Sequence, residues 1–531
     1  MTQPSILRRI RAILFAIFAV ALSHNLFFVV LPIRLSEGGF DTGDIGLAMS
    51  MFAVGAVMAG LFGSRAVLRA GHVRAFATMV ATLSIVSIVH SYSNDIWLTG
   101  LLRIVAGFCF VASFITLESW LNVLSDQSNR GKVFSIYQIC FAVGFGVAPF
   151  LFSFSSVQDP RLFGLLSIFL CISLIIMAMS RLPQPELPAR GSAMALGKLW
   201  RYSPSGTLSC VCAGLISSAS VSLLSLYAYE RGISGIWLSL ALGSFQMGGL
   251  LSQYPTGWLA DRYDKRSVAA GLMVIGVVSN ALIVMENFVA MPTSVLIFLF
   301  LVSGGSGVAL FPLAVTQVFD HIESKEAMPA TSTMQILLGA GGIAGPIIAG
   351  FLMNAYGALW LYYYLIAVHA FVMIFLLTRK LFVRTQTLEA SSPFKVTVQP
   401  TSMGASELDP RINYSLAKID NPELKLLLVA LAQQPRDPRA LIDTALQSSM
   451  LTASDVAINM VLALPKQAGE LVGLLIDLYP TERLSVALSL HDLWILRKER
   501  INAMILKALE QGASSTERAE LAKMMADLEK V

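Results

Sequence analysis

Apolar runs of about 20 residues recur along the first 380 residues, and a short polar or charged segment ends each run. An α-helix of about 20 residues at about 1.5 Å per residue spans the hydrocarbon core of a bilayer. The pattern therefore predicts twelve membrane helices. The first ends near residue 33, and the others lie at about 43–64, 74–93, 97–124, 133–155, 161–180, 205–229, 235–259, 268–288, 292–318, 329–353 and 357–378.

The first apolar run follows Arg8, Arg9 and Arg11, as the core of a signal peptide does. However, no small-residue cleavage site follows it, and the run is long enough to span the membrane. We interpret it as the first membrane helix, with its N-terminus in the cytoplasm.

The twelve runs form two related sets of six. Two short basic segments, Gly60 to Arg65 and Gly257 to Arg266, interrupt the hydrophobic pattern, and their first glycines are 197 positions apart. The same offset pairs Arg34 with Arg231, Gly46 with Gly243, Gly107 with Gly304, Gln138 with Gln335, Gly144 with Gly341, and Pro149 with Pro346. Internal repeats of this kind are typical of secondary transporters. We expect an all-α membrane protein with two pseudo-symmetric six-helix halves.

Composition supports this interpretation. Of the 531 residues, 55% are hydrophobic and only 13% are charged, about half of the charge content of a soluble protein. Residues 381–531 hold 16 of the 38 Lys and Arg and 18 of the 33 Asp and Glu, so the first 380 residues carry a net charge of +7. The excess of base is best explained as cytoplasmic loop charge, and we expect no nucleic-acid partner.

The polar segments alternate in charge as the positive-inside rule requires. Inner segments hold Arg65, Arg69 and Arg74, then Arg130 and Lys132, Arg262, Lys265 and Arg266, and finally Arg379 and Lys380, whereas outer segments hold Glu37, Asp41, Asp95, Asp159 and Glu286. The sequence thus predicts a multi-pass protein of the cytoplasmic membrane with both termini in the cytoplasm. The acidic segment from Asp320 to Glu326 breaks this trend.

No feature of the sequence points to a cofactor or a metal. All five cysteines lie in apolar runs, so we expect no disulfides and a packing role for each thiol. No Walker-type phosphate loop accompanies the helices, which makes ATP an unlikely source of energy.

The motifs resemble those of the Major Facilitator Superfamily. The segment from Gly257 to Arg266 is similar to the signature of that family between helices 2 and 3, except that Asp264 stands where the family has Gly. The first copy has Ser64 in place of the family's Asp. Arg103 with Gly107 is similar to the fourth-helix motif, although Ala106 replaces its Gln, and Gly341 to Pro346 is similar to a Gly-x-x-x-Gly-Pro motif. The resemblance covers about residues 10–380.

This resemblance implies a gate on the cytoplasmic side. Asp261, at the end of the eighth helix, would meet the start of a helix in the other half and hold the gate shut. By repeat symmetry we expect its partner near Arg130. Gly60, Arg65, Gly257, Arg262 and Arg266 complete the two gating loops, and the missing acid at Ser64 predicts gates of unequal strength. The alternative is that Asp261 and its neighbouring bases only anchor the turn.

The eleventh helix carries a nearly bare glycine face, which includes Gly341 and Gly345. This face permits close helix packing, and Pro346 frees a backbone carbonyl and bends the helix. Pro149 is its degenerate counterpart in the fifth helix. Packing and rocking between the halves are equally compatible with this pattern.

Charges within the spans are the best candidates for transport chemistry. Arg103 and Glu118 lie on one stripe of the fourth helix, about 22 Å apart along its axis. We hypothesise that Glu118 takes part in proton coupling and Arg103 in charge balance or substrate contact. In the alternative, Glu118 and Asn122 tie down an inner loop. Further candidates for the cavity lining are His24, Asn25, Gln138, Gln246 and Gln335, although a lone His such as His24 is more often a packing residue, a role that we assign to His369.

The chain continues beyond the membrane part. We divide it into a first half at 1–180, an inter-half link at 181–204, a second half at 205–380, a flexible linker at 381–410 and a cytoplasmic helical domain at 411–531. Helices in this last domain are predicted near 421–434, 438–449, 453–464, 467–478, 481–511 and 515–529. Its expected role is regulatory or protein-binding.

Two classes of function fit these features. The first is a secondary active transporter, driven by protons, which moves a small organic solute by alternating access; sparse intramembrane charge favours efflux of lipophilic compounds, while uptake stays open. The alternative is a transporter-like sensor or scaffold that signals through its helical tail. An enzyme is the least expected class, because no nucleophile, base and orienting group come together in the sequence.

Overall fold

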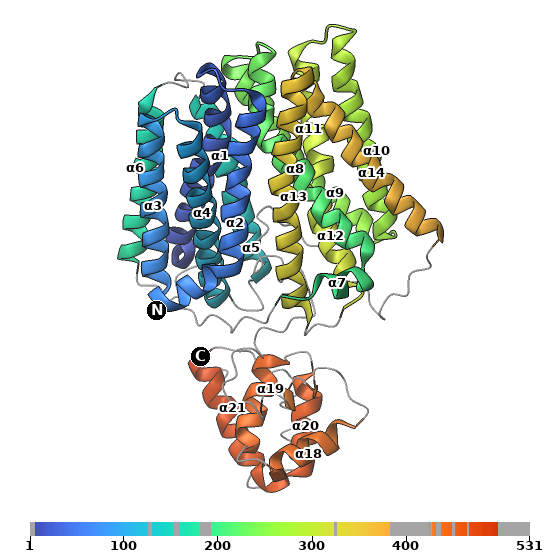
Figure 1. The fold of residues 1–531 in the computed structure, drawn as a ribbon. Helices are drawn as coiled ribbons and strands as arrows, with labels where there is room; N and C mark the ends of the chain where they lie inside the picture. Colours follow the sequence, from blue (N-terminus) through green and yellow to red (C-terminus); the bar gives the residue numbers. More distant parts are fainter. Residues whose placement is uncertain are drawn as a thin grey trace. The chain divides into compact units, whose positions relative to one another are not determined.

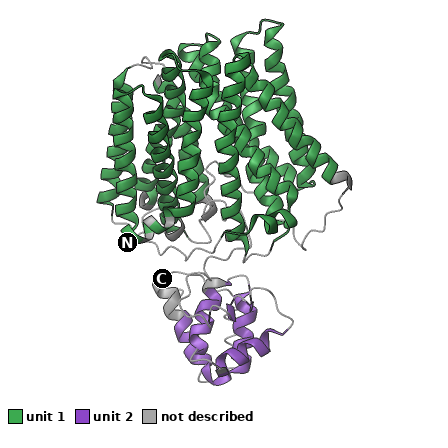
Figure 2. Ribbon diagram, viewed as in Figure 1, with its two compact units in different colours: residues 1–410 green, residues 411–531 purple. Residues whose placement is uncertain are grey.

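The computed structural model places the chain in two compact units, Met1–Pro410 and Arg411–Val531 (Figure 2). It describes residues 6–125, 130–152, 159–180, 193–322 and 326–382 of the first unit. In the second unit it describes residues 424, 427–428, 430–431, 437–448, 452–464 and 467–497.

The first half of the membrane unit consists of six helices, drawn from blue to teal in Figure 1. They are α1 (Ile6–Glu37), α2 (Thr42–Ala70), α3 (His72–Tyr92), α4 (Ile96–Leu124), α5 (Arg130–Phe152) and α6 (Pro160–Met179). In α4 and α6 the first turn is capped by an aspartate side chain, Asp95 and Asp159, which accepts a backbone N–H.

The second half begins with a short helix that the sequence pattern did not predict, α7 (Leu196–Tyr202). Six spans follow, formed by α8 (Pro204–Glu230), α9 (Gly235–Ala260), α10 (Lys265–Val284) with the 3-10 turn η1 (Met285–Asn287), α11 (Thr293–Val308) with α12 (Leu310–Phe319), α13 (Ala327–Tyr356) and α14 (Trp360–Phe382). The span of α11 and α12 is interrupted because Pro312 offers no N–H to the carbonyl of Val308, four residues earlier.

The prediction of twelve spans is confirmed, since twelve described helices are long and apolar enough to cross a membrane. One boundary was wrong. The second span was expected to end near residue 64, but α2 continues to Ala70, so Gly60 and Arg65 lie inside a helix instead of a loop. The turn is at Gly71, whose φ of 78° is a conformation that glycine adopts without a steric penalty.

Equivalent glycine contacts define the structural repeat. A methyl group added to Gly107 would lie 2.1 Å from the carbonyl oxygen of Phe52, and one added to Gly304 would lie 2.0 Å from that of Phe245. Gly107 and Gly304 are 197 positions apart, whereas Phe52 and Phe245 are 193 apart. The ends of α1 and α8 also differ by 193 positions. The offset is therefore 193 through the early helices of each half and 197 from the fourth span onward.

The change of offset corrects three of the sequence matches. The pairs that involve Arg34, Gly46 and Gly60 are one helical turn out of register, and the structural counterpart of Asp261 is Leu68. The four extra residues lie between α10 and α11, where η1 has no counterpart before α4. A slip of four residues nearly equals the 3.6-residue helical period, so it leaves the hydrophobic face unchanged and the sequence pattern does not reveal it.

The two halves contact each other closely in the part of the bundle that the charge pattern predicts to be outer. A methyl group on Gly46 of α2 would lie 2.3 Å from the carbonyl oxygen of Pro346 in α13. Ser239 of α9 donates a hydrogen bond to the carbonyl of Pro149 in α5 at 2.6 Å, and Ser225 of α8 donates to that of Phe28 in α1 at 3.1 Å. Backbone-to-backbone packing of this kind joins the halves at this end.

The described part of the predicted link, residues 193–203, is attached to the second half. The N–H of Met194 donates to the carbonyl of Pro329, and Thr333 of α13 donates to the carbonyl of Met194 at 2.7 Å. Lys198 of α7 forms an ion pair with Glu326. These contacts fix α7 beside the start of α13.

The second unit contains α18 (Pro438–Ser448), α19 (Ala453–Ala463), α20 (Ala468–Leu478), the 3-10 turn η3 (Pro480–Glu482) and α21 (Arg483–Arg497). Val456, Leu475 and Leu490 belong to its own hydrophobic core. The Tyr479 hydroxyl donates to Asp443 at 2.7 Å, which raises the pKa of Tyr479 above its ordinary value. The helices predicted for most of 421–434, for 498–511 and for 515–529 lie outside the described residues.

Candidate functional site

Arg103 of α4 lies in the core of the first half. Its guanidinium carbon is 4.1 Å from the ring centre of Phe28 and 4.7 Å from that of Phe52. Cation–π attraction of this kind is strongest where water is excluded, and Arg103 is only 1% exposed. Its Nε and Nη2 atoms have no hydrogen-bond partner. The structure thus holds a buried cation in an aromatic cage.

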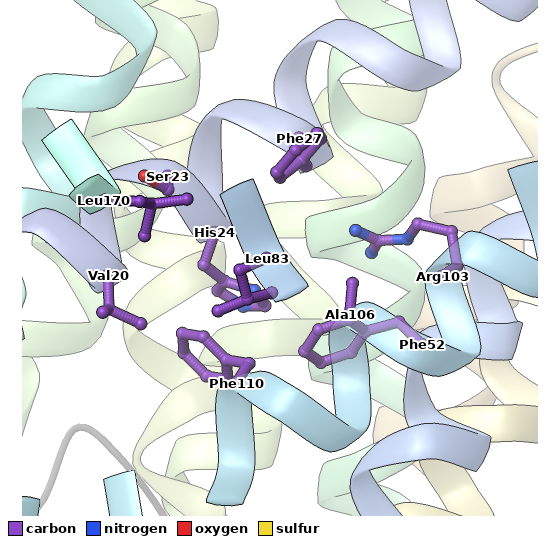
Figure 3. Close-up of a pocket in the computed structure, with 10 residues that line it drawn as sticks. All are labelled: Val20, Ser23, His24, Phe27, Phe52, Leu83, Arg103, Ala106, Phe110 and Leu170. Carbon is purple, nitrogen blue, oxygen red and sulfur yellow. The ribbon is translucent and has the colours of Figure 1, made fainter. Parts of the chain in front are cut away.

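His24 of α1 joins the same cluster. Its ring stacks on Phe110 with centroids 3.9 Å apart, and it lies 4.7 Å from the ring of Phe52. Figure 3 shows His24 and Arg103 on the lining of one small cavity. The sequence named both residues as candidates, and the fold brings them together.

Asn25 compensates for a proline inside α5. Pro149 has no N–H, so the carbonyl of Phe145, four residues earlier in α5, has no partner within its own helix. The side-chain amide of Asn25 donates to that carbonyl at 2.6 Å. Asn25 therefore satisfies a buried acceptor that would otherwise be costly to leave unpaired.

The second half repeats this device with a different side chain. Pro346 frees the carbonyl of Gly342 in α13, and the hydroxyl of Ser218 in α8 donates to it at 2.8 Å. Asn25 and Ser218 are 193 positions apart, as the structural repeat requires. The sequence could not pair them, because the residue types differ.

Glu118 lies elsewhere on α4. It is completely buried, and the hydroxyl of Tyr137 in α5 donates to its Oε1 at 2.7 Å. The 15 residues between Arg103 and Glu118 correspond to about 22 Å of helix, so the two groups do not form one site. Tyr137 was not among the predicted site residues; its place on the fifth helix, with no charge of its own, gave no signal.

The amide candidates differ in their surroundings. Gln138 is buried, while Gln246 and Gln335 are half-buried, and the Nε2 of Gln335 has no hydrogen-bond partner. Gln253 of α9, which sequence reasoning did not select, is completely buried and neither of its amide atoms is bonded. A polar residue one turn before Gly257 is the only sequence signal that could have indicated it.

The segment after α9 forms a tight, capped turn. Asp261 is the C-cap residue of α9 and is exposed, and the guanidinium of Arg262 lies 3.8 Å from the ring centre of Trp258. Asp264, which departs from the family signature, accepts the N–H of Ser267 and so caps α10. Arg266 is buried. The side chain of Arg130, the expected partner region of Asp261, lies outside the described residues.

The acidic segment that broke the charge pattern has partners on the same end of the bundle. Both carboxylate oxygens of Asp320 accept hydrogen bonds from the Lys265 ammonium at 2.8 Å, and both side chains are buried. Glu326 pairs with Lys198. These acids thus neutralise bases at the predicted inner end.

The glycine face of α13 packs closely against α8. A methyl group on Gly341 would lie 2.0 Å from the carbonyl oxygen of Val211, and one on Gly345 would lie 2.6 Å from that of Leu215. His369 of α14 lies against Gly276 and contacts Ser306 through Nε2 at 3.3 Å. These contacts are helix packing within the second half.

Relatives with this architecture are known. An uncharacterized MFS-type transporter of Yersinia pestis (strain Pestoides F) is 24% identical over 386 residues, which cover 71% of this chain and 96% of that protein. The uncharacterized MFS-type transporter YcaD of Salmonella arizonae is 22% identical over 380 residues, which cover 70% and 96% of the two chains. Both are described as transporters, a class of protein that generally is not enzymatic.

Solved structures share the fold. The nucleoside transporter NupG matches with a TM-score of 0.58 at 15% identity and covers 72% of this chain and 100% of its own. A bacterial homolog of the human lysosomal transporter Spinster, inward-facing and occupied, matches with a TM-score of 0.57 at 13% identity and covers 72% and 97%. A family profile described as the Major Facilitator Superfamily matches residues 13–237 and 206–464. With its twelve spans and repeated halves, the chain belongs to the Major Facilitator Superfamily and is a multi-pass membrane transporter.

Proposed function

We propose that this transporter uses a proton gradient to export a small lipophilic organic solute across the cytoplasmic membrane. It alternates between two states, and both of its termini lie in the cytoplasm. The close backbone contacts near Gly46 and Pro149 support a state that is shut at the predicted outer end. Rocking of the two repeats about a central site would open that end in the other state.

The observation that carries proton coupling is the burial of Glu118. A carboxyl group within a membrane helix is costly when charged, and such groups commonly mark proton pathways. Tyr137 donates to Glu118, so uptake or loss of a proton changes the contact between α4 and α5. In the competing structural role, Glu118 serves only to join these two helices.

Transport by liposomes that contain the full chain tests this proposal. We expect Glu118→Gln to abolish solute movement driven by an imposed pH gradient while downhill exchange persists. Tyr137→Phe removes the same hydrogen bond but keeps the carboxyl, so it should weaken pH-driven transport without abolishing it. If Glu118→Gln and wild type respond equally to the gradient, Glu118 is structural and the proton-coupling proposal fails.

Glu286→Gln is the matched control. Glu286 is also a buried carboxylate, but it accepts from Tyr227 and pairs with Arg231 in the second half. We expect this variant to keep its dependence on the pH gradient. The comparison separates a specific role of Glu118 from a general effect of removing a buried acid.

The solute class is supported by the scarcity of charge within the spans, which provides few partners for a multiply charged solute. A panel of lipophilic cations, nucleosides and organic anions, applied to liposomes with protein of known orientation, tests both class and direction. The related fold of NupG, a nucleoside transporter, makes nucleosides the first comparison. Accumulation of a hydrophilic solute on the cytoplasmic side would contradict efflux.

We also propose that Asp261 acts as a latch for the predicted inner gate. It ends α9, while its structural counterpart in the first half is Leu68, which supports gates of unequal strength. Asp261→Asn should increase cysteine labelling of the predicted inner cavity, whereas Asp264→Asn, which changes the acid that caps α10, should not. If wild type and Asp261→Asn are labelled equally, the latch proposal fails and Asp261 only anchors the turn.

A further inference from the structure

Two helix pairs in the interface between the halves are equivalent by the repeat, α2 with α13 and α9 with α5. We call them the α2–α13 seam and the α5–α9 seam. An exact repeat would give two seams of equal extent. In the structure the α2–α13 seam is clearly the more extensive one. The halves are therefore joined more closely on one side than on the other.

The contacts of the α2–α13 seam run from the predicted outer end past the middle of the span. Thr42, at the start of α2, donates to the carbonyl of Gly350 at 3.2 Å. Further along both helices, a methyl group on Gly339 would lie 3.7 Å from the Cβ of Val57. Thr42 and Val57 are 15 residues apart, which corresponds to about 22 Å of helix in a hydrocarbon core of about 30 Å. This seam is closed over most of its length.

The contacts of the α5–α9 seam lie near the predicted outer end. Ser239, in the second turn of α9, donates to the carbonyl of Pro149 at 2.6 Å. One turn further along α9, a methyl group on Gly243 would lie 3.6 Å from the ring of Phe150. A methyl group on Gly146, one turn of α5 closer to the inner end than Phe150, would meet nothing within 4 Å. Together with the smaller extent of this seam, these positions indicate that α5 and α9 separate towards the predicted inner end.

Side-chain size explains the difference between the seams. Small residues let membrane helices approach closely, and the α2–α13 seam has them, since the Cβ of Ala53 lies 3.3 Å from a methyl group built on Gly342. The residue of α9 that corresponds to Ala53 is Gln246, and the residue of α5 that corresponds to Gly339 is Ala142. Larger side chains at these positions hold α5 and α9 further apart than α2 and α13.

The border of the α5–α9 seam is apolar on its exposed side. By helical spacing, exposed apolar side chains flank the seam on both helices, Ile139 and Val143 on α5 and Met247 and Leu251 on α9. Gln246 and Leu250, each one position before an exposed residue of α9, are half-buried. A lipophilic solute is concentrated in hydrocarbon and not in water, so it would reach this border from within the bilayer.

We propose that the lipophilic solute enters the protein from the inner leaflet of the bilayer, through the inner part of the α5–α9 seam. The α2–α13 seam stays closed at this depth and acts as the pivot between the halves. Gln246, beside the exposed Met247, is the first hydrogen-bonding side chain that the solute meets on α9. The class of solute rests on the proposed function above, whereas the opening of the seam to lipid does not.

Fluorescence quenching tests the opening without any transported solute. The full chain, with the two cysteines that are not buried replaced by Cys140→Ala and Cys171→Ala, is labelled with a bimane at Leu250→Cys and reconstituted. Val57→Cys, the equivalent position on the closed seam, is the matched control. Phospholipids with brominated acyl chains should quench the label at residue 250 and leave the label at residue 57 unchanged; failure of Val57→Cys to react with the label would also support a closed seam. Equal quenching of both labels, or quenching of neither, would overturn the proposal.

Cross-linking tests whether the solute uses this opening. A disulfide needs Cβ atoms about 3.5–4.5 Å apart, and the 3.7 Å between the positions of Val57 and Gly339 meets this need, so Val57→Cys with Gly339→Cys locks the α2–α13 seam. Ala142→Cys with Leu250→Cys, joined by a cleavable thiol cross-linker, locks the equivalent part of the α5–α9 seam. We expect this second cross-link to abolish transport of a lipophilic solute in liposomes and its cleavage to restore transport, while the disulfide leaves transport intact.

Two transport results would overturn the proposal. One is transport that survives the cross-link of the α5–α9 seam, and the other is transport that is lost equally when either seam is locked. Restoration after cleavage excludes misfolding as the cause of a loss. If wild type moves no lipophilic solute, the proposed function fails, and the quenching measurement still decides whether the seam opens to lipid.

Discussion

The two halves share the positions of their close helix contacts, but they differ in their buried polar and charged residues. Gly55 and Gly248, 193 positions apart, bring α2 onto α4 and α9 onto α11 in the same way. At the polar positions the halves diverge: the counterparts of Arg103, Glu118 and Tyr137 in the second half are Phe300, Val315 and Met334. Conversely, the buried pair Lys265–Asp320 corresponds to His72 and Val123 in the first half.

This difference separates what the duplication requires from what function adds. Close helix contacts must be kept in both halves because the packing of each half depends on them. Ionisable groups in the membrane are costly and persist where they have a task. The first half carries such groups inside its fourth span, which makes it the centre of the proposed coupling, whereas the second half pairs its charges near the ends of its spans.

The largest expected effect tests the charge pair that only the second half has. Lys265→Met or Asp320→Asn alone should lower the free energy of unfolding by about 3–5 kcal/mol, because each leaves a buried charge without its partner. SDS-induced unfolding in mixed micelles measures this. The double variant Lys265→Leu with Asp320→Val removes both charges together and should recover most of the loss. A double variant as unstable as either single one would contradict the view that an unpaired buried charge causes the loss.

The next effect tests the shared frame. A methyl group would meet the carbonyl oxygen of Ile104 at 1.9 Å in Gly55→Ala and that of Leu301 at 1.7 Å in Gly248→Ala. Overpacking of this kind should cost about 1–3 kcal/mol, and the cost should be similar in both halves. Gly164→Ala and Gly271→Ala, where a methyl group meets nothing within 4 Å, are the controls and should not destabilise. A cost in only one half would argue against a common frame.

A smaller effect tests the two prolines. Asn25→Ala and Ser218→Ala should each cost about 1 kcal/mol of unfolding free energy, because each leaves a buried carbonyl unpaired. In a Pro149→Ala background the carbonyl of Phe145 regains a helical N–H, so Asn25→Ala should cost less there. The double-mutant cycle measures this coupling. Additive costs would mean that Asn25 serves another purpose, such as lining the transport path.

The smallest expected effect concerns the tail. Deletion of residues 385–531 should leave transport by reconstituted protein near the wild-type rate, because the membrane unit Met1–Pro410 is compact by itself. Loss of a signalling output with transport unchanged would favour a regulatory tail. Loss of both would favour the sensor alternative.

The sequence predicted the twelve spans because long apolar runs have one stable solution in a bilayer. It could not locate the end of α2, because Arg65 and Arg69 are compatible with either a loop or a helix at the membrane surface. Candidate residues such as His24 and Arg103 were found by their charge within apolar runs, but their common cavity depends on helix packing. The roles of Asn25 and Ser218 required the positions of carbonyls in neighbouring helices, which no local pattern encodes.

The attachment of α7 to α13 has a practical consequence for anyone who divides this protein. Met194, Lys198 and Thr333 make residues 193–203 a strap of the second half. Two co-expressed fragments should therefore be separated before residue 193, so that the C-terminal fragment retains its strap. A fluorescent reporter inserted between Met194 and Lys198 would interrupt the strap, and a change in its signal would then report damage instead of motion.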